Sequence, residues 1–374
     1  MHNKKNIMFV PVPEAGHILP MLPIARRLAA GGCSVSFFTS FHFAAELNKQ
    51  GFAVDTYTEL SGKPWPEQPL YAPRIAGRLL WEEEWHSVTS HTSISEMFLS
   101  RLRKIASIRE VSLAVVDRLF HRSPNGVMDK FRLEIPVVFL STSLLYSKKD
   151  LVLNDPTTIV LCPPEILPAE HYSRFSRIIF AEPSIDFSRE DVFFELSAVR
   201  APAPLVLCAF GSQTSHRREM ANRLKVISSV AQISPDIQFV VGVGHPQPDY
   251  LTMNLPRLQN TNYYPAIPQL SLLSRASLLI THGGLGSIKE AIYMGVPMLC
   301  WPLYGDQSFN SGCIKALQLG DKVGGESMTP NSMLAQISAL MSSGQVRSKL
   351  ARFQEMFRER ESNPTAAARL YEMA

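Results

Sequence analysis

The sequence predicts an α/β protein with two domains, each a doubly wound parallel sheet covered by helices. Three observations lead to this prediction. Short apolar runs alternate with helical stretches, the order that parallel sheets with crossover helices require. The length of 374 residues exceeds what one hydrophobic core usually serves. A polar, proline-bearing segment also interrupts the alternation near the middle of the chain.

The elements of the first sheet begin close to the N-terminus. Residues 7–12 (IMFVPV) form a nearly continuous apolar run, typical of a strand buried on both faces. A helix over 17–30 follows, with Pro20 and Pro23 near its start, where a missing N–H is tolerated best. Further strands are predicted at 34–39, 52–57, 113–117 and 135–141.

The stretch from about 61 to 100 departs from this pattern. Proline, tryptophan and histidine are frequent there, which predicts loops and short helices over a cleft rather than elements of the sheet. Its aromatic residues suggest contact with an apolar or aromatic small molecule.

A second series of strands follows the polar segment between Glu182 and Pro204, which we interpret as the inter-domain linker. In open parallel sheets, ligands bind beyond the carboxyl ends of the strands, so each loop after a strand is a candidate site. The strands of this second sheet are predicted at 204–210, 238–244, 277–281 and 297–301.

Composition and charge exclude several classes of protein. Hydrophobic residues make up 45% and charged residues 19% of the chain, as in ordinary globular proteins. The net charge of +4, without a basic stripe interleaved with aromatics, argues against nucleic-acid binding. No apolar run reaches the length of a membrane span and no signal peptide is recognised, so we expect a cytoplasmic protein without integral membrane association. The five widely spaced cysteines predict buried free thiols in a reducing compartment and no metal site.

The densest chemical signal follows the strand predicted at 277–281. A glycine-rich turn there leads into a helix, and its candidate residues are His282, Gly284, Gly286, Ser287 and Glu290. Glycines let the backbone approach a ligand, and the N–H groups of a first helical turn attract an anion, so this turn can bind a diphosphate without a metal. The side chains of His282 and Ser287 add donors, and Glu290 can accept hydrogen bonds from a ribose.

Two further polar residues follow the next predicted strand. Asp306 and Gln307 reach the same rim and offer acceptors and donors for the hydroxyls of a sugar ring. A plainer interpretation makes them the start of the next helix. Likewise, Ser287 and Glu290 have the spacing of a capping box, which would give them a structural role instead of a ligand.

With these residues the chain resembles the inverting GT-B glycosyltransferases, which include the plant and bacterial UDP-glycosyltransferases and the macrolide glycosyltransferases. The resemblance is strongest in one run of 26 residues: His282-x-Gly284-x-x-Ser287-x-x-Glu290, then Gly295-Val296-Pro297 and Asp306-Gln307. Elsewhere it is carried by Pro11-x-x-x-x-Gly16-His17-x-x-Pro20, Asp117, Phe210-Gly211-Ser212 and Pro268-Gln269. It therefore extends over most of the chain.

The resemblance implies a GT-B fold, with two Rossmann-like domains facing a central cleft. We expect an acceptor-binding domain over 1–198, a nucleotide-sugar-binding domain over 199–345, and a C-terminal helical segment over 346–374 that packs back toward the first domain. The implied enzyme is a hexosyltransferase that moves a sugar, expected to be glucose, from a UDP-sugar to a hydroxyl of a small apolar or aromatic acceptor. A dTDP-sugar is the other expected co-substrate. No cofactor is expected, and the protein is expected to be a monomer or homodimer.

The resemblance also assigns roles to individual residues. His17 would be the general base and Asp117 the carboxylate that orients it. The implied donor-binding residues are Gly16, Ser212, Gln269, His282, Gly284, Gly286, Ser287, Glu290, Asp306 and Gln307. The expected acceptor-binding residues are Trp81, Trp85, His86 and Ser141.

These residue types suit the chemistry. An acceptor hydroxyl becomes a good nucleophile only as its proton is removed, and an imidazole titrates near working pH. A buried carboxylate on the other ring nitrogen fixes the tautomer and stabilises the imidazolium. The leaving diphosphate would be stabilised by the helix terminus and His282. Attack from the opposite face would invert the anomeric centre.

Three positions depart from the family pattern. Ala266 stands where many relatives carry a tryptophan that stacks on the base, with Tyr263 and Tyr264 nearby, and Leu285 and Gly286 replace the tryptophan and asparagine of plant members. Three alternatives stay open: a nucleotide-sugar epimerase on a similar fold, a non-catalytic nucleotide-sugar-binding subunit, and a membrane-lipid glycosyltransferase. The last lacks a basic amphipathic anchor in the sequence.

Overall fold

The computed structural model describes most of the chain, and it divides into two compact units. Unit 1 comprises Met1–Pro164, Ala169–Asp186 and Arg360–Ala374, and unit 2 comprises Glu165–Pro168 and Phe187–Glu359. The residues described are 4–57, 74–75, 78–79, 92–122, 134–144, 157–168, 177–189, 192, 194, 202–211, 218–244, 255–303, 305–324 and 328–374.

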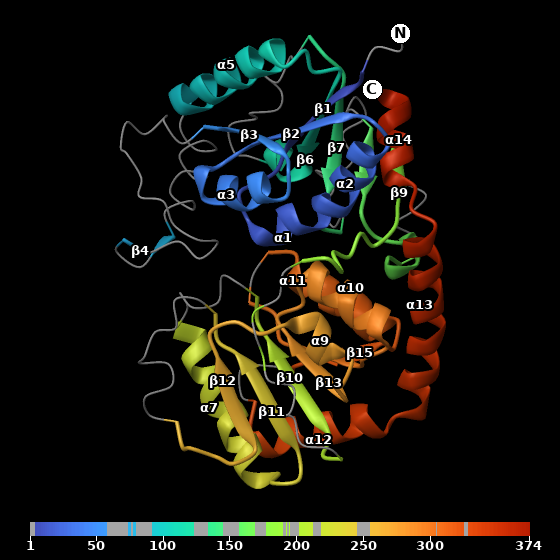
Figure 1. The fold of residues 1–374 in the computed structure, drawn as a ribbon. Coiled ribbons are helices and arrows are strands. Elements are labelled where there is room, and N and C mark those ends of the chain that lie inside the picture. Colours follow the sequence, from blue (N-terminus) through green and yellow to red (C-terminus); the bar gives the residue numbers. More distant parts are fainter. Residues whose placement is uncertain are drawn as a thin grey trace. The chain divides into compact units, whose positions relative to one another are not determined.

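Unit 1 is built on a seven-stranded sheet in the order β3-β2-β1-β6-β7-β8-β9 (Figure 1). Every pairing in this sheet is parallel. Its strands are β1 (Asn6–Val10), β2 (Ser34–Thr39), β3 (Ala53–Thr56), β6 (Leu113–Asp117), β7 (Val137–Ser141), β8 (Thr158–Val160) and β9 (Ile178–Phe180).

Alternate residues of these strands enter two separate hydrophobic cores. Ile7 and Phe9 of β1 pack in one core with helices α2 (Leu22–Ala30) and α3 (Phe41–Lys49). Met8 and Val10 pack in the other, with helix α5 (Thr92–Ile108). A strand whose successive side chains point to opposite faces must be apolar throughout when both faces are covered, which explains the continuous apolar run of the sequence.

The helix predicted over 17–30 is instead three pieces: α1 (Ala15–Ile18), the 3-10 turn η1 (Leu19–Met21) and α2. Pro20 lies in the first positions of η1, and Pro23 lies in the first positions of α2. A proline lacks the N–H that an uninterrupted helix would need, so each proline begins a new piece.

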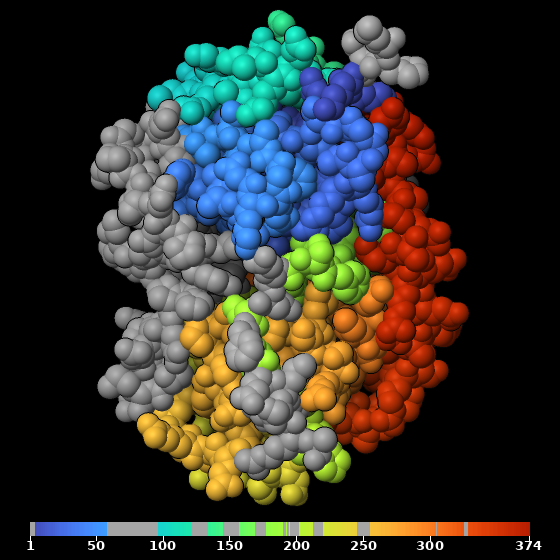
Figure 2. All heavy atoms as spheres, viewed as in Figure 1, coloured from blue at the N-terminus to red at the C-terminus, as the bar shows by residue number. Residues whose placement is uncertain are grey.

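The prediction of loops and short helices over 61–100 is wrong at its end, where α5 begins at Thr92 and runs for 17 residues. Phe98, Leu99, Leu102 and Ala106 recur at helical spacing and are buried in the second core, so the helix is amphipathic. Figure 2 shows part of this helix at the surface in teal. Ile108, the last residue of the helix, is 66% exposed. Two short antiparallel strands, β4 (Arg74–Ile75) and β5 (Arg78–Leu79), also lie within this stretch.

The C-terminal helix α14 (Ala366–Met373) belongs to unit 1. It contacts α2, and its Ala366 and Leu370 are buried in the same core as Phe9. The carboxylate of Glu182 accepts hydrogen bonds from the backbone N–H groups of Thr365 and Ala366 at 2.9 and 3.0 Å. These contacts satisfy donors that the start of a helix leaves without intrahelical partners.

Unit 2 is built on a six-stranded parallel sheet in the order β12-β11-β10-β13-β14-β15. Its strands are β10 (Leu205–Ala209), β11 (Gln238–Gly242), β12 (Thr261–Tyr264), β13 (Leu278–Thr281), β14 (Met298–Cys300) and β15 (Gly320–Lys322). Its helices are α7 (Arg218–Ile233), α9 (Gln269–Leu273), α10 (Leu285–Met294), α11 (Gln307–Ala316), α12 (Pro330–Ser342) and α13 (Gly344–Ser362), the last continuing into unit 1.

The prediction of two doubly wound parallel-sheet domains is confirmed within each unit. All five cysteines are buried and free, as predicted. Four strands of the two parallel sheets, β8, β9, β12 and β15, lie outside the strands predicted from the sequence. They lie toward the edges of the two sheets, and they are short or partly polar. Within the described ranges, no helix combines the length and the hydropathy needed to cross a membrane.

Candidate active site

His17 lies in α1, the short helix that follows the first strand of unit 1. Its Nδ1 is 2.7 Å from Oδ2 of Asp117, the last residue of β6. β1 and β6 are neighbouring parallel strands, with Val10 paired to Val116, so the loop after β1 and the end of β6 meet at the same sheet edge. The structure therefore brings together the two residues that the sequence assigned to the base, 100 positions apart in the chain.

The carboxylate of Asp117 is well placed to orient this imidazole. Its side chain is 2% exposed, and its second oxygen accepts a hydrogen bond from the backbone N–H of Leu119 at 2.9 Å. With both of its oxygens held, the carboxylate of Asp117 offers a fixed acceptor to Nδ1–H of His17, which favours the tautomer whose Nε2 can take a proton.

Sequence reasoning missed two neighbours of this ring. The hydroxyl of Thr142 is 2.9 Å from His17 Nδ1, and Oε2 of Glu14 is 4.0 Å from Nε2. Thr142 follows the end of β7, which pairs with β6, so the parallel order of strands was the available signal. The predicted acceptor residue Ser141 precedes it, is buried, and donates to the backbone oxygen of Ser143 at 2.7 Å. Gly16 adjoins His17 in α1, where an added Cβ would meet nothing within 4 Å.

In unit 2, the turn after β13 encloses the ring of His282 between glycines. A Cβ at Gly284 would lie 2.4 Å from Nε2 of His282, and one at Gly211 would lie 3.0 Å from the same atom. Gly283 has φ +86°, and a Cβ there would be 2.6 Å from Oγ of Ser311. The glycines of this turn are therefore required by contact with His282 and α11 as well as by backbone conformation.

Burial lowers the pKa of His282 to about 4. A hydrogen bond from the ring to the backbone of Ala209 acts in the opposite direction, and the nearby guanidinium of Arg223 lowers the pKa further. The imidazole is consequently neutral at pH 7 and suited to hydrogen bonding rather than to a permanent charge.

Helix α10 begins directly after this turn. Its N-cap residue is Gly284, which supplies no side-chain cap, and Gly286 lies exposed in the first turn with nothing within 4 Å of an added Cβ. The capping-box interpretation of Ser287 and Glu290 is therefore wrong, because both residues lie inside the helix instead of at its cap. The N–H groups of this first turn carry the positive end of the helix dipole, a favourable place for an anion.

Glu290 of this helix accepts hydrogen bonds from polar side chains around it. Its Oε2 accepts a hydrogen bond from Nε2 of Gln269 at 2.6 Å, and the same amide nitrogen is 3.2 Å from Oγ of Ser287. Arg189 contacts both oxygens of Glu290, at 2.6 and 3.4 Å. Three residues predicted for the donor site are thus joined in one network, together with an arginine that no sequence motif indicated.

Asp306 and Gln307 lie at the start of α11, as the plainer interpretation held, and they also border the glycine turn. Asn310 joins the two, donating to the backbone oxygen of Gly283 at 3.0 Å and to Oδ2 of Asp306 at 3.1 Å. Oε1 of Gln307 accepts from the backbone N–H of Leu303 at 2.8 Å. The helix start and the turn after β13 therefore form one connected rim.

Arg223 of α7 is a second residue that sequence reasoning missed. It is 5% exposed and donates to the backbone oxygens of Trp301 and Pro302 at 2.6 and 2.8 Å. Its guanidinium lies over the rings of Phe210 and Trp301, at 5.5 and 4.7 Å from their centroids. It therefore fixes the start of the loop that leads to Asp306 and places a positive charge behind the glycine turn.

Four predicted site residues lie outside the described residues: Ser212, Trp81, Trp85 and His86. Phe98, from the same aromatic stretch as the last three, belongs to the core, where its ring contacts Phe38, Tyr57 and Phe120. In the described part of the chain, no cluster of three or more histidine, cysteine and acidic side chains is arranged to hold a metal ion.

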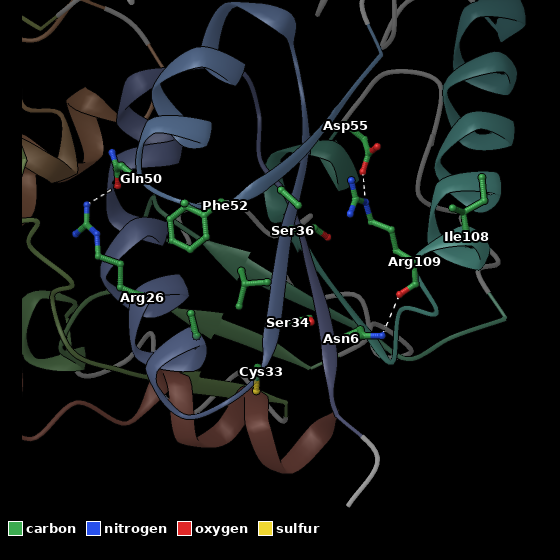
Figure 3. Close-up of a pocket in the computed structure, with 14 residues that line it drawn as sticks. Asn6, Arg26, Cys33, Ser34, Ser36, Gln50, Phe52, Asp55, Ile108 and Arg109 are labelled. Atoms are coloured by element: carbon green, nitrogen blue, oxygen red, sulfur yellow. Dashed lines mark hydrogen bonds and ion pairs between the residues drawn. The ribbon is translucent and has the colours of Figure 1, made fainter.

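A hollow of about 700 Å³ in unit 1 is an alternative place for a ligand (Figure 3). It is lined by Asn6, Ser34 and Ala53, which begin β1, β2 and β3, so it lies at the amino ends of the strands, away from His17. Both of its arginines are paired: Arg26 with Asp186 and Gln50, and Arg109 with Asp55. Ligands of open parallel sheets bind at the opposite edge, so the His17 edge is the better candidate.

Two doubly wound sheets, one with a histidine–aspartate pair and the other with a glycine turn opening a helix, together define the class of GT-B glycosyltransferases. Residues 197–371 match the family model described as UDP-glucoronosyl and UDP-glucosyl transferase. The NDP-glycosyltransferase YjiC of Bacillus subtilis (strain 168) is 22% identical over 98% of this chain and 97% of its own. The human UDP-glucuronosyltransferase 2A3 is 32% identical over 28% of this chain and 20% of its own.

Solved structures give the same fold. The glycosyltransferase of kitacinnamycin matches with a TM-score of 0.76 and 20% identity, covering both chains completely. The spinosyn rhamnosyltransferase SpnG complexed with thymidine diphosphate matches with a TM-score of 0.73 and 18% identity, covering 98% of this chain and 99% of its own. Residues 197–371 are thus similar to the UDP-glycosyltransferase family, and the chain is a glycosyltransferase that uses a nucleotide sugar.

Proposed function

We propose that this enzyme transfers glucose from UDP-glucose to a hydroxyl of a small apolar or aromatic acceptor, with inversion at the anomeric carbon. The observation that carries the proposal is the 2.7 Å contact between His17 Nδ1 and the buried carboxylate of Asp117. An imidazole held in this way by a carboxylate is suited to accept a proton at its other nitrogen.

In the proposed reaction, Nε2 of His17 removes the proton of the acceptor hydroxyl as its oxygen attacks the anomeric carbon. The bond from that carbon to the diphosphate oxygen breaks, and the nucleoside diphosphate leaves from the opposite face. Asp117 stabilises the imidazolium that forms. General-base assistance of this kind contributes about 10²–10⁴-fold to a rate.

The residues of unit 2 are proposed to hold the donor. The start of α10, with Gly284, Gly286 and Ser287, would receive the diphosphate, and the neutral ring of His282 would lie beside it. Glu290 and Gln269 would bind the ribose, and Asp306 and Gln307 the sugar hydroxyls. Two hydrogen-bonded groups support this assignment: Gln269 with Ser287 and Glu290, and Asn310 with Gly283 and Asp306.

The domain roles follow from this division of residues. We propose acceptor binding by the N-terminal domain (1–198), with Ser141, Trp81, Trp85 and His86, and donor binding by the C-terminal domain (199–345), with Ser212 added and Gly16 contributed by the first domain. The remaining segment, 346–374, includes α14, which packs on α2. Names among the relatives support natural-product acceptors: one is a solanidine UDP-glucose glucosyltransferase of Solanum tuberosum, 26% identical over 42% of this chain.

The donor can be tested first, without knowing the acceptor. Thermal unfolding is measured with UDP-glucose, other UDP-sugars and dTDP-sugars, since a ligand that binds only the folded chain raises the unfolding temperature. We expect UDP-glucose to give the largest shift. A larger shift with dTDP-sugars would overturn the uridine assignment, and no shift with any sugar nucleotide would overturn the donor site.

Transfer itself is then followed by UDP release and mass spectrometry, with UDP-glucose and a panel of phenols and alicyclic alcohols. The anomeric configuration of the product, read by NMR, tests inversion. A product that retains the donor's configuration would exclude the proposed mechanism.

A further inference from the structure

Arg189 is placed differently from the other residues of the donor site in unit 2, because it comes from the segment that enters this unit and not from the loops and helices that follow its strands. It is the third residue of the segment of unit 2 that begins at Phe187. Its side chain is 17% exposed and that of Glu290 is 10% exposed, so this ion pair is largely shielded from solvent. The family motifs recognised in the sequence do not include it.

The entering segment follows one face of α10. Phe187 contacts the ring of Tyr293 with 4.8 Å between centroids, while Arg189 contacts Glu290. Glu290 and Tyr293 are three residues apart and so lie on the same side of the helix. The segment therefore contacts α10 at two points, through Phe187 and Arg189, and these contacts set the position of Arg189 along the helix.

The contacts of Glu290 hold its carboxylate in one orientation. A carboxylate has about four lone-pair directions, and Arg189 with Gln269 makes three contacts to them, at 2.6, 3.4 and 2.6 Å. A guanidinium that bonds both oxygens fixes the plane of the group as well as its charge. Among the described residues, these contacts leave one direction of the carboxylate, in a fixed place, for a hydroxyl that donates a hydrogen bond.

We propose that Arg189 is a positioning residue for the donor: it orients Glu290 so that this carboxylate accepts a hydroxyl of the nucleotide's ribose. The inference rests on the proposed donor site, of which it specifies one interaction. Arg189 acts through Glu290, and its contribution belongs to binding of the nucleotide. It lowers the cost of ordering Glu290 when the nucleotide binds, which is the general benefit of a preorganised site.

The test combines a change of side chain with a change of ligand. Affinities of the full-length chain for UDP and dTDP are measured by calorimetry, each beside its analogue without ribose hydroxyls (2′,3′-dideoxyuridine and 3′-deoxythymidine diphosphate). Arg189→Ala should raise the Kd of the better-bound parent nucleotide roughly tenfold, the equivalent of one hydrogen bond to a charged group. It should change the Kd of the matching analogue less than twofold.

Two further variants separate geometry from charge. Arg189→Lys keeps the charge but cannot bond both oxygens, so its Kd should lie between those of wild type and Arg189→Ala. Arg352→Ala removes an exposed arginine from α13 and should leave every Kd unchanged. In turnover, Arg189→Ala should raise KM for the sugar nucleotide about tenfold and change kcat less than threefold.

Three results would overturn the inference. Equal losses for a nucleotide and its dideoxy analogue would show a general structural or electrostatic effect. An unchanged Kd would show that Glu290 needs no positioning, and tighter binding by Arg189→Ala would show that the arginine competes with the ribose. If Arg189→Ala does not fold by circular dichroism, Arg189→Gln and Arg189→Lys take its place in the same comparison. Failure of the wild-type chain to bind either diphosphate would instead overturn the donor site itself.

Discussion

The two units each place a histidine just after a strand of a parallel sheet, in opposite electrostatic settings. His17 of unit 1 has a buried carboxylate 2.7 Å from Nδ1 and a second carboxylate 4.0 Å from Nε2. Among the described residues, glycine backbone surrounds the ring of His282 in unit 2, and Arg223 is the charged group that lowers its pKa. Burial beside a guanidinium disfavours the protonated form of His282.

The difference teaches how one residue type serves two chemical roles in one chain. A general base must gain a proton during the reaction, so a carboxylate that stabilises the imidazolium assists it. A residue beside a bound diphosphate needs only to donate or accept hydrogen bonds, and a low pKa keeps it uncharged. In the sequence, both residues are histidines next to glycine. Only their surroundings in the structure distinguish their chemical roles.

The largest expected effect is on the transfer rate, when the general base of unit 1 is removed. His17→Ala should lower the transfer rate by about 10²–10⁴-fold, the usual contribution of a general base, while the Kd for UDP stays within twofold of wild type. Initial rates with saturating donor and calorimetry with UDP measure the two quantities. Transfer that survives in His17→Ala at the wild-type rate would rule out His17 as the base.

A second variant keeps the imidazole of His17 and changes the carboxylate beside it. Asp117→Asn should lower the rate by about 10²-fold, because an amide can impose the wrong tautomer and cannot stabilise an imidazolium. Thr142→Val is the matched change at the same nitrogen, removing the hydroxyl 2.9 Å from Nδ1, and should cost less than tenfold. Equal losses for the two variants would mean that the charge of Asp117 is not the important feature.

In unit 2, alanine substitutions at two glycines test how closely the ring of His282 is enclosed. Gly284→Ala places a Cβ 2.4 Å from His282 Nε2, so we expect about tenfold weaker UDP binding and a loss of about 1–3 kcal/mol in the free energy of unfolding. Gly286→Ala, with nothing within 4 Å, should be neutral or stabilise the helix by about 0.5–1 kcal/mol.

Urea unfolding and UDP calorimetry on both glycine variants check this prediction. Weaker UDP binding in a stable Gly286→Ala variant would indicate that the nucleotide itself approaches this backbone. Full stability and affinity in Gly284→Ala would show that the ring of His282 moves freely, against the enclosed setting described above.

The last prediction concerns how stability depends on pH. The pKa of His282 is about 4 in the folded chain and 6.5 ordinarily, so between these values the unfolded chain binds a proton that the folded chain does not. Its contribution to the free energy of unfolding therefore falls as pH drops from about 6.5 to about 4, by up to roughly 3 kcal/mol, and is constant above about 7.

His282→Gln should lack this part of the pH dependence. Urea unfolding of wild type and variant at pH 7.5 and 4.5 gives the comparison. His42, whose pKa burial also lowers, is present in both proteins, so the difference between the two slopes isolates His282. Identical slopes would show that His282 gains its proton as readily in the folded chain as in the unfolded one.

Several features of the fold could be predicted from local sequence. The strands with continuous apolar residues, such as β1 and β10, are buried on both faces, and that pattern is visible without a structure. Strand β15, whose sequence is Gly-Asp-Lys, carries no such signal: it is a strand because it pairs with β14. Helix α5 was obscured by the tryptophans and histidines before it, although its own apolar residues recur at helical spacing.

The sequence by itself determined the two-sheet architecture, the glycine turn and the residue types available for the chemistry, because apolar periodicity and glycine spacing are local properties of the chain. Only the tertiary structure decided which side chains meet. Asp117, Thr142 and Glu14 surround His17 because parallel strands end at a common edge, and Arg189 reaches Glu290 because the entering segment follows α10. The pKa of His282 was likewise beyond the sequence, since it depends on burial and on Arg223, which lies 59 positions earlier in the chain.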